Sequence, residues 1–142
     1  MIKLGIIGCG NMGGAMLRQM LKAGIFTPGE VLVSDKNPNL RAQLKSELGV
    51  NVTYQNAEAA AADTLLLAVK PQFVQAVGAE IAGAVNPNAL IISIVAGYDL
   101  FMLHRLLENE TAHIIRVMPN SQVPRLRLTS GSASLGMTML VE

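Results

Sequence analysis

The stretch Ile6-Ile7-Gly8-Cys9-Gly10-Asn11-Met12-Gly13 decides the fold of this 142-residue chain. It is a G-x-G-x-x-G motif that directly follows a short apolar run and opens a segment with apolar residues at helical spacing. In that order of strand, glycine turn and amphipathic helix, the motif indicates dinucleotide binding. Gly8 would make the tight turn, Gly10 would let the backbone approach a pyrophosphate, and Gly13 would let the helix pack closely on the strand. The helix N-terminus would then offer free N–H groups and a partial positive charge to phosphates.

Short apolar runs alternate with helical patterns along the rest of the chain. The runs predicted as strands are Ile2–Ile7, Val31–Ser34, Val50–Val52, Thr64–Val69, Leu90–Val95 and Ile114–Met118. The predicted helices are Met12–Leu21, Leu40–Leu48, Ala57–Ala62, Gln72–Val85 and Leu100–Leu107. Asn56 is predicted as the N-cap of the third of these helices. Nearly continuous apolar runs are typical of parallel strands covered on both faces, and short connections imply right-handed βαβ units. The predicted fold class is therefore α/β, a doubly wound, Rossmann-like parallel sheet.

The pattern changes after Asn120. Residues 121–134 show no sustained strand or helix period, so we predict a loop or extended tail there, followed by a short strand at Met137–Val141. The chain is therefore divided into a dinucleotide-binding domain, residues 1–120, and an atypical tail, residues 121–142.

The composition excludes several classes of protein. Hydrophobic residues make up 51% of the chain and charged residues 15%, which is the composition of a folding chain rather than a disordered one. A net charge of +1 gives no support for nucleic-acid binding, and the apolar stretch Ala89–Leu103 is too short and too interrupted to span a membrane. The chain contains one cysteine, Cys9, and two histidines, so a metal site is not expected. Cys9 is interpreted as a small side chain of the turn. No secretory signal is recognised, so we expect a cytoplasmic protein.

The end of the second predicted strand offers groups for the adenosine end of a dinucleotide. Asp35 lies about 20 residues after the glycine motif, where an acid can bind the ribose 2′-hydroxyl of NAD. Ser34, Lys36 and Asn37 beside it could instead hold the 2′-phosphate of NADP, with Lys36 as a point charge. A third reading is that Asp35 only caps the turn that follows. The sequence therefore leaves NAD and NADP open.

Three more stretches, each after a later strand, carry a family resemblance. They are Ala68-Val69-Lys70-Pro71, Ser93-Ile94-Val95-Ala96-Gly97 and Ile115-Arg116-Val117-Met118-Pro119-Asn120. Together with the glycine motif, in this order and at these separations, they resemble the N-terminal domain of the pyrroline-5-carboxylate reductase family over residues 1–120. The resemblance implies a domain that carries NADP or NAD in an oxidoreductase of proline biosynthesis. Its small-molecule substrate would be pyrroline-5-carboxylate, a cyclic imine that is reduced to L-proline.

The resemblance also implies a set of site residues at the carboxyl ends of the strands. The cofactor-binding residues it implies are Ile7, Gly8, Cys9, Gly10, Asn11, Met12, Gly13, Ser34, Asp35, Lys36, Asn56, Ala68, Val69, Lys70, Pro71, Ala96 and Gly97. The residues it places near the nicotinamide and the substrate are Met118, Pro119 and Asn120. Lys70 could donate to a ribose hydroxyl or could be a surface lysine that ends the strand.

No catalytic group is identified from the sequence. His104 lies on an apolar helix face and is interpreted as a packed or surface histidine, whereas His113 is expected to be exposed. Arg116 could bind a substrate carboxylate or could pair with a neighbouring acid.

The tail departs from the family pattern. Ser121-Gln122 stands where the family continues with Thr-Pro. Gly136-Met137-Thr138 resembles the next Gly-x-Thr of the family, but the segment before it is longer than is usual in the family. We expect the chain to lack the C-terminal helical domain that the family has, and therefore to be a fragment, truncation or frameshift that is incomplete for catalysis and tends to self-associate. The alternatives are a related NADP-dependent reductase, such as a β-hydroxyacid dehydrogenase, and a non-catalytic dinucleotide-binding module.

Overall fold

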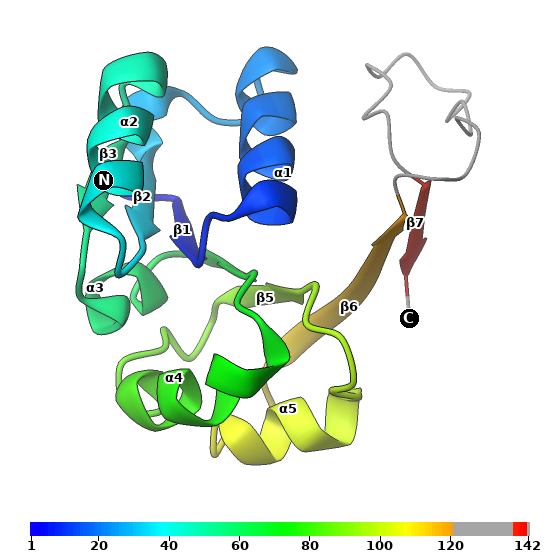
Figure 1. Cartoon of the computed structure of the whole chain (residues 1–142). Coiled ribbons are helices and arrows are strands. Elements are labelled where there is room, and N and C mark those ends of the chain that lie inside the picture. The colour runs from blue at the N-terminus through cyan, green and yellow to red at the C-terminus, as the bar shows by residue number, and fades with distance from the viewer. Residues whose placement is uncertain (121–137, 142) are drawn as a thin grey trace.

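The structure, a computed structural model, describes residues 1–120 and 138–141. Within them, seven strands form one sheet in the order β3-β2-β1-β4-β5-β6-β7 (Figure 1). The strands are β1 Leu4–Ile7, β2 Val31–Ser34, β3 Asn51–Thr53, β4 Thr64–Leu67, β5 Leu90–Ser93, β6 His113–Asn120 and β7 Thr138–Val141. The first six run parallel, and β7 pairs antiparallel with β6 at the sheet edge. The predicted doubly wound α/β class is confirmed, with one antiparallel strand added.

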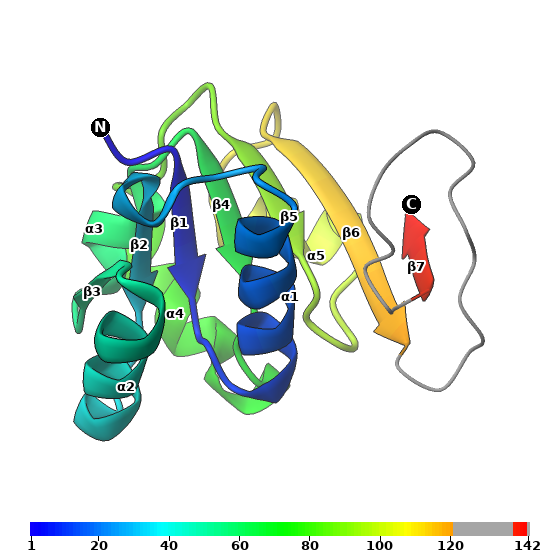
Figure 2. The ribbon, with the colours of Figure 1, turned by 90° about the horizontal axis from the view of Figure 1, so that it is seen from above.

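Helices cover both faces of this sheet. They are α1 Asn11–Lys22, α2 Pro38–Leu48, α3 Asn56–Ala60, α4 Val74–Ile81 and α5 Leu100–Leu106, with 3-10 turns η1 at Pro28–Glu30 and η2 at Pro71–Phe73. Helices α1 and α2 lie on one face, and α3, α4 and α5 lie on the other (Figure 2). Among these described helices, none is long and apolar enough to cross a bilayer.

Each face of the sheet has its own apolar core, because successive strand residues point to opposite sides. On the α1–α2 side the buried residues include Leu4, Ile6, Leu17, Val31, Val33, Leu44 and Leu66. On the opposite side they include Ile7, Leu65, Leu67, Val74, Ile81, Ile91 and Leu107. The strands are therefore buried on both faces, which explains why they are continuous apolar runs in the sequence.

Several element boundaries differ from the sequence prediction. Helix α4 is shorter than Gln72–Val85, because the chain after Lys70 first makes the 3-10 turn η2, and residues 82–85 form turns instead of helix. The apolar runs of β4 and β5 continue past the strand ends as Ala68-Val69 and Ile94-Val95. The strand predicted at Met137–Val141 is present as Thr138–Val141, while 121–137 and 142 lie outside the described residues.

The prediction that Asn56 caps α3 is wrong. Asn56 is the first residue of the helix, Gln55 occupies the N-cap position, and no side chain makes a cap hydrogen bond. The Asn56 amide is instead buried and bonded to Ser34 and Glu80. Local sequence favoured a cap because Asn is common there, but tertiary partners on β2 and α4 take its side chain.

The order of the strands creates a switch point between β1 and β4. The chain leaves β1 toward β2 on one side, and after β3 it returns to β4 on the other side of β1. In open α/β sheets, ligands bind in the crevice outside the carboxyl ends of the strands at such a point. The glycine turn that follows β1 lies there.

Gly5 in the middle of β1 is predicted to be essential for packing. A Cβ at Gly5 would run into the backbone of Ala59 in α3, which cannot give way. We expect Gly5→Ala to lower the free energy of unfolding by about 2 kcal/mol or more in urea titration. Gly83→Ala, where an added Cβ meets nothing within 4 Å, is the control and should leave it within about 0.5 kcal/mol or raise it. Equal stability of the two variants would contradict this packing argument.

Candidate functional site

The turn after β1 can be built only with glycine at two positions. Gly8 has φ +84°, and a Cβ there would lie 2.9 Å from the carbonyl oxygen of Ala68. A Cβ at Gly13 would lie 2.8 Å from the carbonyl oxygen of Gly8 and 3.0 Å from the Cβ of Ala68. The predicted tight turn and the predicted close packing of α1 are both confirmed.

The N-terminus of α1 is open. Its N-cap is Gly10, which has an extended backbone and no side-chain cap, and a Cβ at Gly10 would meet nothing within 4 Å. The first N–H groups of a helix have no intrahelical partner and carry the positive end of its dipole. This end of α1 therefore suits an anion that approaches the backbone directly.

Two adjoining hollows lie along the carboxyl ends of the strands. The first, of about 420 Å³, lies between the ends of β1 and β2, the start of α3 and one face of α4. The second, of about 470 Å³, lies over the start of α1 and the ends of β4, β5 and β6. They share Gly10, Ala68, Val69 and Lys70, so they form one groove that passes over the glycine turn.

Every residue that the resemblance implied for the cofactor lines one of the two hollows. The first is lined by Ile7, Gly8, Cys9, Gly10, Ser34, Asp35, Lys36, Asn56, Ala68, Val69 and Lys70. The second adds Asn11, Met12, Gly13, Pro71, Ala96, Gly97 and Met118. Pro119 and Asn120 are the last residues of β6, at the same edge of the sheet. Segments far apart in the sequence thus meet where the switch point lies.

Asp35 fastens the glycine turn to the end of β2. Its Oδ2 accepts a hydrogen bond of 3.0 Å from the Cys9 backbone N–H, and its Oδ1 accepts one of 2.9 Å from the Asn37 N–H. Asp35 therefore caps the turn that follows β2, but it does more than that because it also binds the glycine turn. One N–H of the glycine turn is already used by this carboxylate, while Asn37 caps α2 through Asn39 and Leu40.

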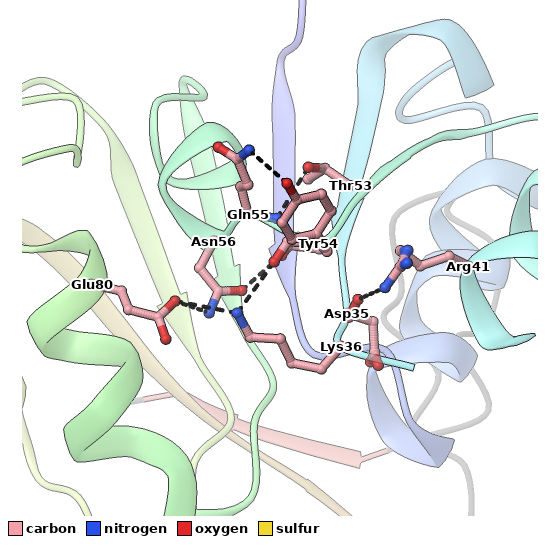
Figure 3. Close-up of polar contacts among 9 residues, drawn as sticks. Asp35, Lys36, Arg41, Thr53, Tyr54, Gln55, Asn56 and Glu80 are labelled. Carbon is pink, nitrogen blue, oxygen red and sulfur yellow. Dashed lines mark hydrogen bonds and ion pairs between the residues drawn. The ribbon is translucent and has the colours of Figure 1, made fainter. Parts of the chain in front are cut away.

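Four polar residues form a chain of contacts across the first hollow, and Figure 3 shows three of them, Lys36, Asn56 and Glu80. The buried Ser34 hydroxyl donates to Asn56 Oδ1 at 2.7 Å, and Asn56 Nδ2 donates to Glu80 Oε2 at 2.7 Å. Lys36 Nζ lies 3.6 Å from the same Glu80 oxygen and donates to the Tyr54 carbonyl at 3.2 Å. The hydroxyl proton of Ser34 is thus donated to Asn56, and the alternative that Ser34 helps to hold a 2′-phosphate stays a prediction.

Sequence reasoning missed the face of α4 that closes the first hollow. The missed lining residues are Phe73, at the N-cap of α4, and Ala76, Val77 and Glu80 within the helix. Their spacing of three, four and seven places them on one helix face, so the pattern itself contained the signal. In the second hollow Ile94 and Val95 were missed, and Arg116 was considered only for the substrate.

The titratable groups offer little catalytic chemistry in the described part of the chain. Burial, with a further contribution from Asp35, raises the pKa of the Cys9 thiol to about 11, so Cys9 is a poor nucleophile. His104 Nδ1 lies 2.9 Å from the carbonyl oxygen of Asn109, and His113 is exposed at the start of β6. Among the described residues there is no group of three potential metal ligands.

The comparisons with known proteins agree with this geometry. The model of the family described as NADP oxidoreductase, coenzyme F420-dependent, matches residues 3–97. The chain belongs to this family. Over 120 residues it is 39% identical to the pyrroline-5-carboxylate reductase of Escherichia coli (strain K12), which covers 84% of the chain and 44% of the relative. The resemblance to pyrroline-5-carboxylate reductases is thereby confirmed.

Solved structures support the same relationship. A pyrroline-5-carboxylate reductase from Coxiella burnetii superposes with a TM-score of 0.77 at 27% identity, over 84% of this chain and 44% of that one. The Plasmodium falciparum pyrroline carboxylate reductase with NADP bound gives 0.71 at 28% identity, over 84% and 42%. The chain spans about half the length of the curated relatives it matches.

The raised pKa of Cys9 makes a prediction about its reactivity. With a pKa of about 11, about one thiol in a thousand is a thiolate at pH 8, so labelling by Ellman's reagent should be at least about tenfold slower than in the urea-unfolded chain. The rate should rise as the pH approaches 11, because the thiolate fraction grows. Equal rates for folded and unfolded chains at pH 8 would contradict this assignment.

Proposed function

We propose that the chain binds NADPH or NADH, and that it is the nucleotide-binding part of an oxidoreductase that reduces pyrroline-5-carboxylate to L-proline. The observation that carries the proposal is the glycine turn, whose uncapped helix N-terminus lies on a groove lined by all the cofactor-binding residues that the resemblance implies. Residues 1–120 would form the nucleotide-binding unit, with residues 121–142 as an accessory segment whose strand β7 extends the sheet.

The residues present fit a dinucleotide. Because a Cβ at Gly10 would extend into open space, glycine there keeps a path for a phosphate to the N–H groups of α1. The first hollow offers Asn56 and Lys36 to the adenosine ribose, and Lys70 stands where the two hollows join. Ala96 and Gly97 have little or no side chain, so a flat ring could lie against the backbone on their side of the second hollow.

The bound cofactor supplies the hydride, and the protein supplies orientation. Met118 and Arg116 of β6 line the second hollow, as Ala96 does. Met118 would offer an apolar surface to the cyclic imine, and Arg116 would offer a cation to its carboxylate. A related reductase with another substrate would use the same nucleotide groove. Consumption of NADPH in the presence of pyrroline-5-carboxylate, rather than binding, separates these alternatives.

Calorimetric titration with NADPH and NADH tests the proposal. The unaltered chain should bind at least one of them below millimolar concentration, and Gly10→Ala should weaken binding at least about tenfold by filling the phosphate path. The fold should persist, because Ala at this N-cap costs about 1 kcal/mol or less. Gly83→Ala, also open around its Cβ, is the matched control and should bind like the unaltered chain. An absence of heat with both nucleotides would overturn the proposal.

We further propose that the chain self-associates through its apolar surface. Phe101 and Met102 of α5 and Met118 of β6 are large apolar side chains that are about half exposed or more. Burial of such side chains is a common source of association. Light scattering at increasing concentration should show a mass above 15.1 kDa, and Phe101→Ser should reduce it. A monomer mass at all concentrations would contradict the proposal.

A further inference from the structure

Glu80 is the acceptor on which the contacts across the first hollow converge. It comes from α4, whereas the residues it contacts come from the start of α3 and the end of β2 (Figure 3). Its Oε2 accepts from Asn56 at 2.7 Å and lies 3.6 Å from Lys36 Nζ. The inference below rests on the proposed nucleotide binding.

The carboxylate of Glu80 fixes the orientation of the Asn56 amide. A carboxylate only accepts hydrogen bonds, so the Asn56 NH₂ group must face Glu80 and the carbonyl oxygen must face Ser34. Asn56 is 4% exposed and lines the hollow, so this orientation leaves its second amide N–H as the donor available to a ligand. Without an acceptor at position 80, the amide would lose the partner that holds it.

The same carboxylate restrains the cation nearest the ribose 2′ position. Lys36 directly follows Asp35, at the strand end where Rossmann folds distinguish a 2′-hydroxyl from a 2′-phosphate. The side chains of Lys36 and Glu80 are 66% and 43% exposed, so their ion pair is weak and exchangeable. A 2′-phosphate would have to compete with Glu80 for Lys36.

We propose that Glu80 is a positioning and selectivity residue for the adenosine end of the cofactor. It holds the Asn56 amide ready for the nucleotide, and it partly neutralises Lys36, so that the 2′-phosphate of NADPH gains little over the 2′-hydroxyl of NADH. Arg41, a second cation near this end, is already turned to the Asp35 carbonyl at 2.7 Å and to the Tyr54 ring. The Asp35 carboxylate is likewise held, by the N–H groups of Cys9 and Asn37, so the charges free to exchange partners at the 2′ position are those of Lys36 and Glu80.

Two substitutions separate the two roles. Glu80→Gln keeps an oxygen that can accept from Asn56 but removes the charge that restrains Lys36. Glu80→Ala removes both. The matched control is Glu58→Gln, which makes the same change of charge at an exposed site on α3 outside both hollows. Each variant is titrated calorimetrically with NADPH and with NADH, after a thermal melt has shown that it is folded.

The expected pattern is specific. In Glu80→Gln, the preference for NADPH over NADH should rise about threefold to fivefold at low salt, the range of one exposed ion pair, and the gain should shrink at high salt. NADH affinity should stay within about twofold of the unaltered chain, because the Asn56 acceptor is kept. In Glu80→Ala, NADH affinity should fall at least about threefold, and Glu58→Gln should change neither quantity.

A double substitution tests whether the effect passes through Lys36. In a Lys36→Met background, Glu80→Gln should no longer raise the preference for NADPH. A persistent rise there, an unchanged preference in Glu80→Gln, or an unchanged NADH affinity in Glu80→Ala would each overturn the inference while leaving nucleotide binding intact. Failure of the unaltered chain to bind either nucleotide would instead overturn the proposed function and this inference with it. Should Glu80→Ala not fold, the Glu80→Gln and Lys36→Met results decide alone.

Discussion

The rest of the structure depends on one constraint: there is no room for side chains where the β1–α1 turn meets the end of β4. Gly8 has a positive φ and touches the Ala68 backbone, and Gly13 lies against the Gly8 carbonyl. These contacts bring the first turn of α1 to the ends of β1 and β4 at once. A side chain at either position would push the helix away and separate the two hollows, which join over this turn.

The structure could be predicted from the sequence where one physical requirement acts on consecutive residues. Strands buried on both faces require unbroken apolar runs, so β2 at Val31–Ser34 was predicted with its observed ends. Gly49 has φ +70°, which is the left-handed conformation that a C-cap glycine supplies, and α2 ends just before it at Leu48, the predicted last residue. The groove proposed for the cofactor could be predicted in the same way, because the carboxyl ends of parallel strands must gather at one edge.

What the sequence could not show is which partner takes a polar side chain. Asn is a residue type that is common at N-caps, yet the Asn56 amide is held by Ser34 and Glu80, which lie 22 and 24 residues away in sequence. Asp35 could have faced a ribose or only the following turn, and its two oxygens accept from Cys9 and Asn37. Such choices depend on distances between elements, which local patterns do not contain.

These two arrangements divide the adenosine end between rigid and exchangeable parts. The bonds of Asp35 and Asn56 are short and buried or half-buried, so they form a preorganised frame that need not reorder when a ligand arrives. Lys36 is exposed and its ion pair is long, so it can exchange partners at small cost. Under the proposed function, the frame would recognise the adenosine that both nucleotides share, and the exchangeable pair would recognise the 2′ substituent. A change of nucleotide preference would then need only the charge at Glu80 or Lys36 to change, and the glycine turn would stay as it is.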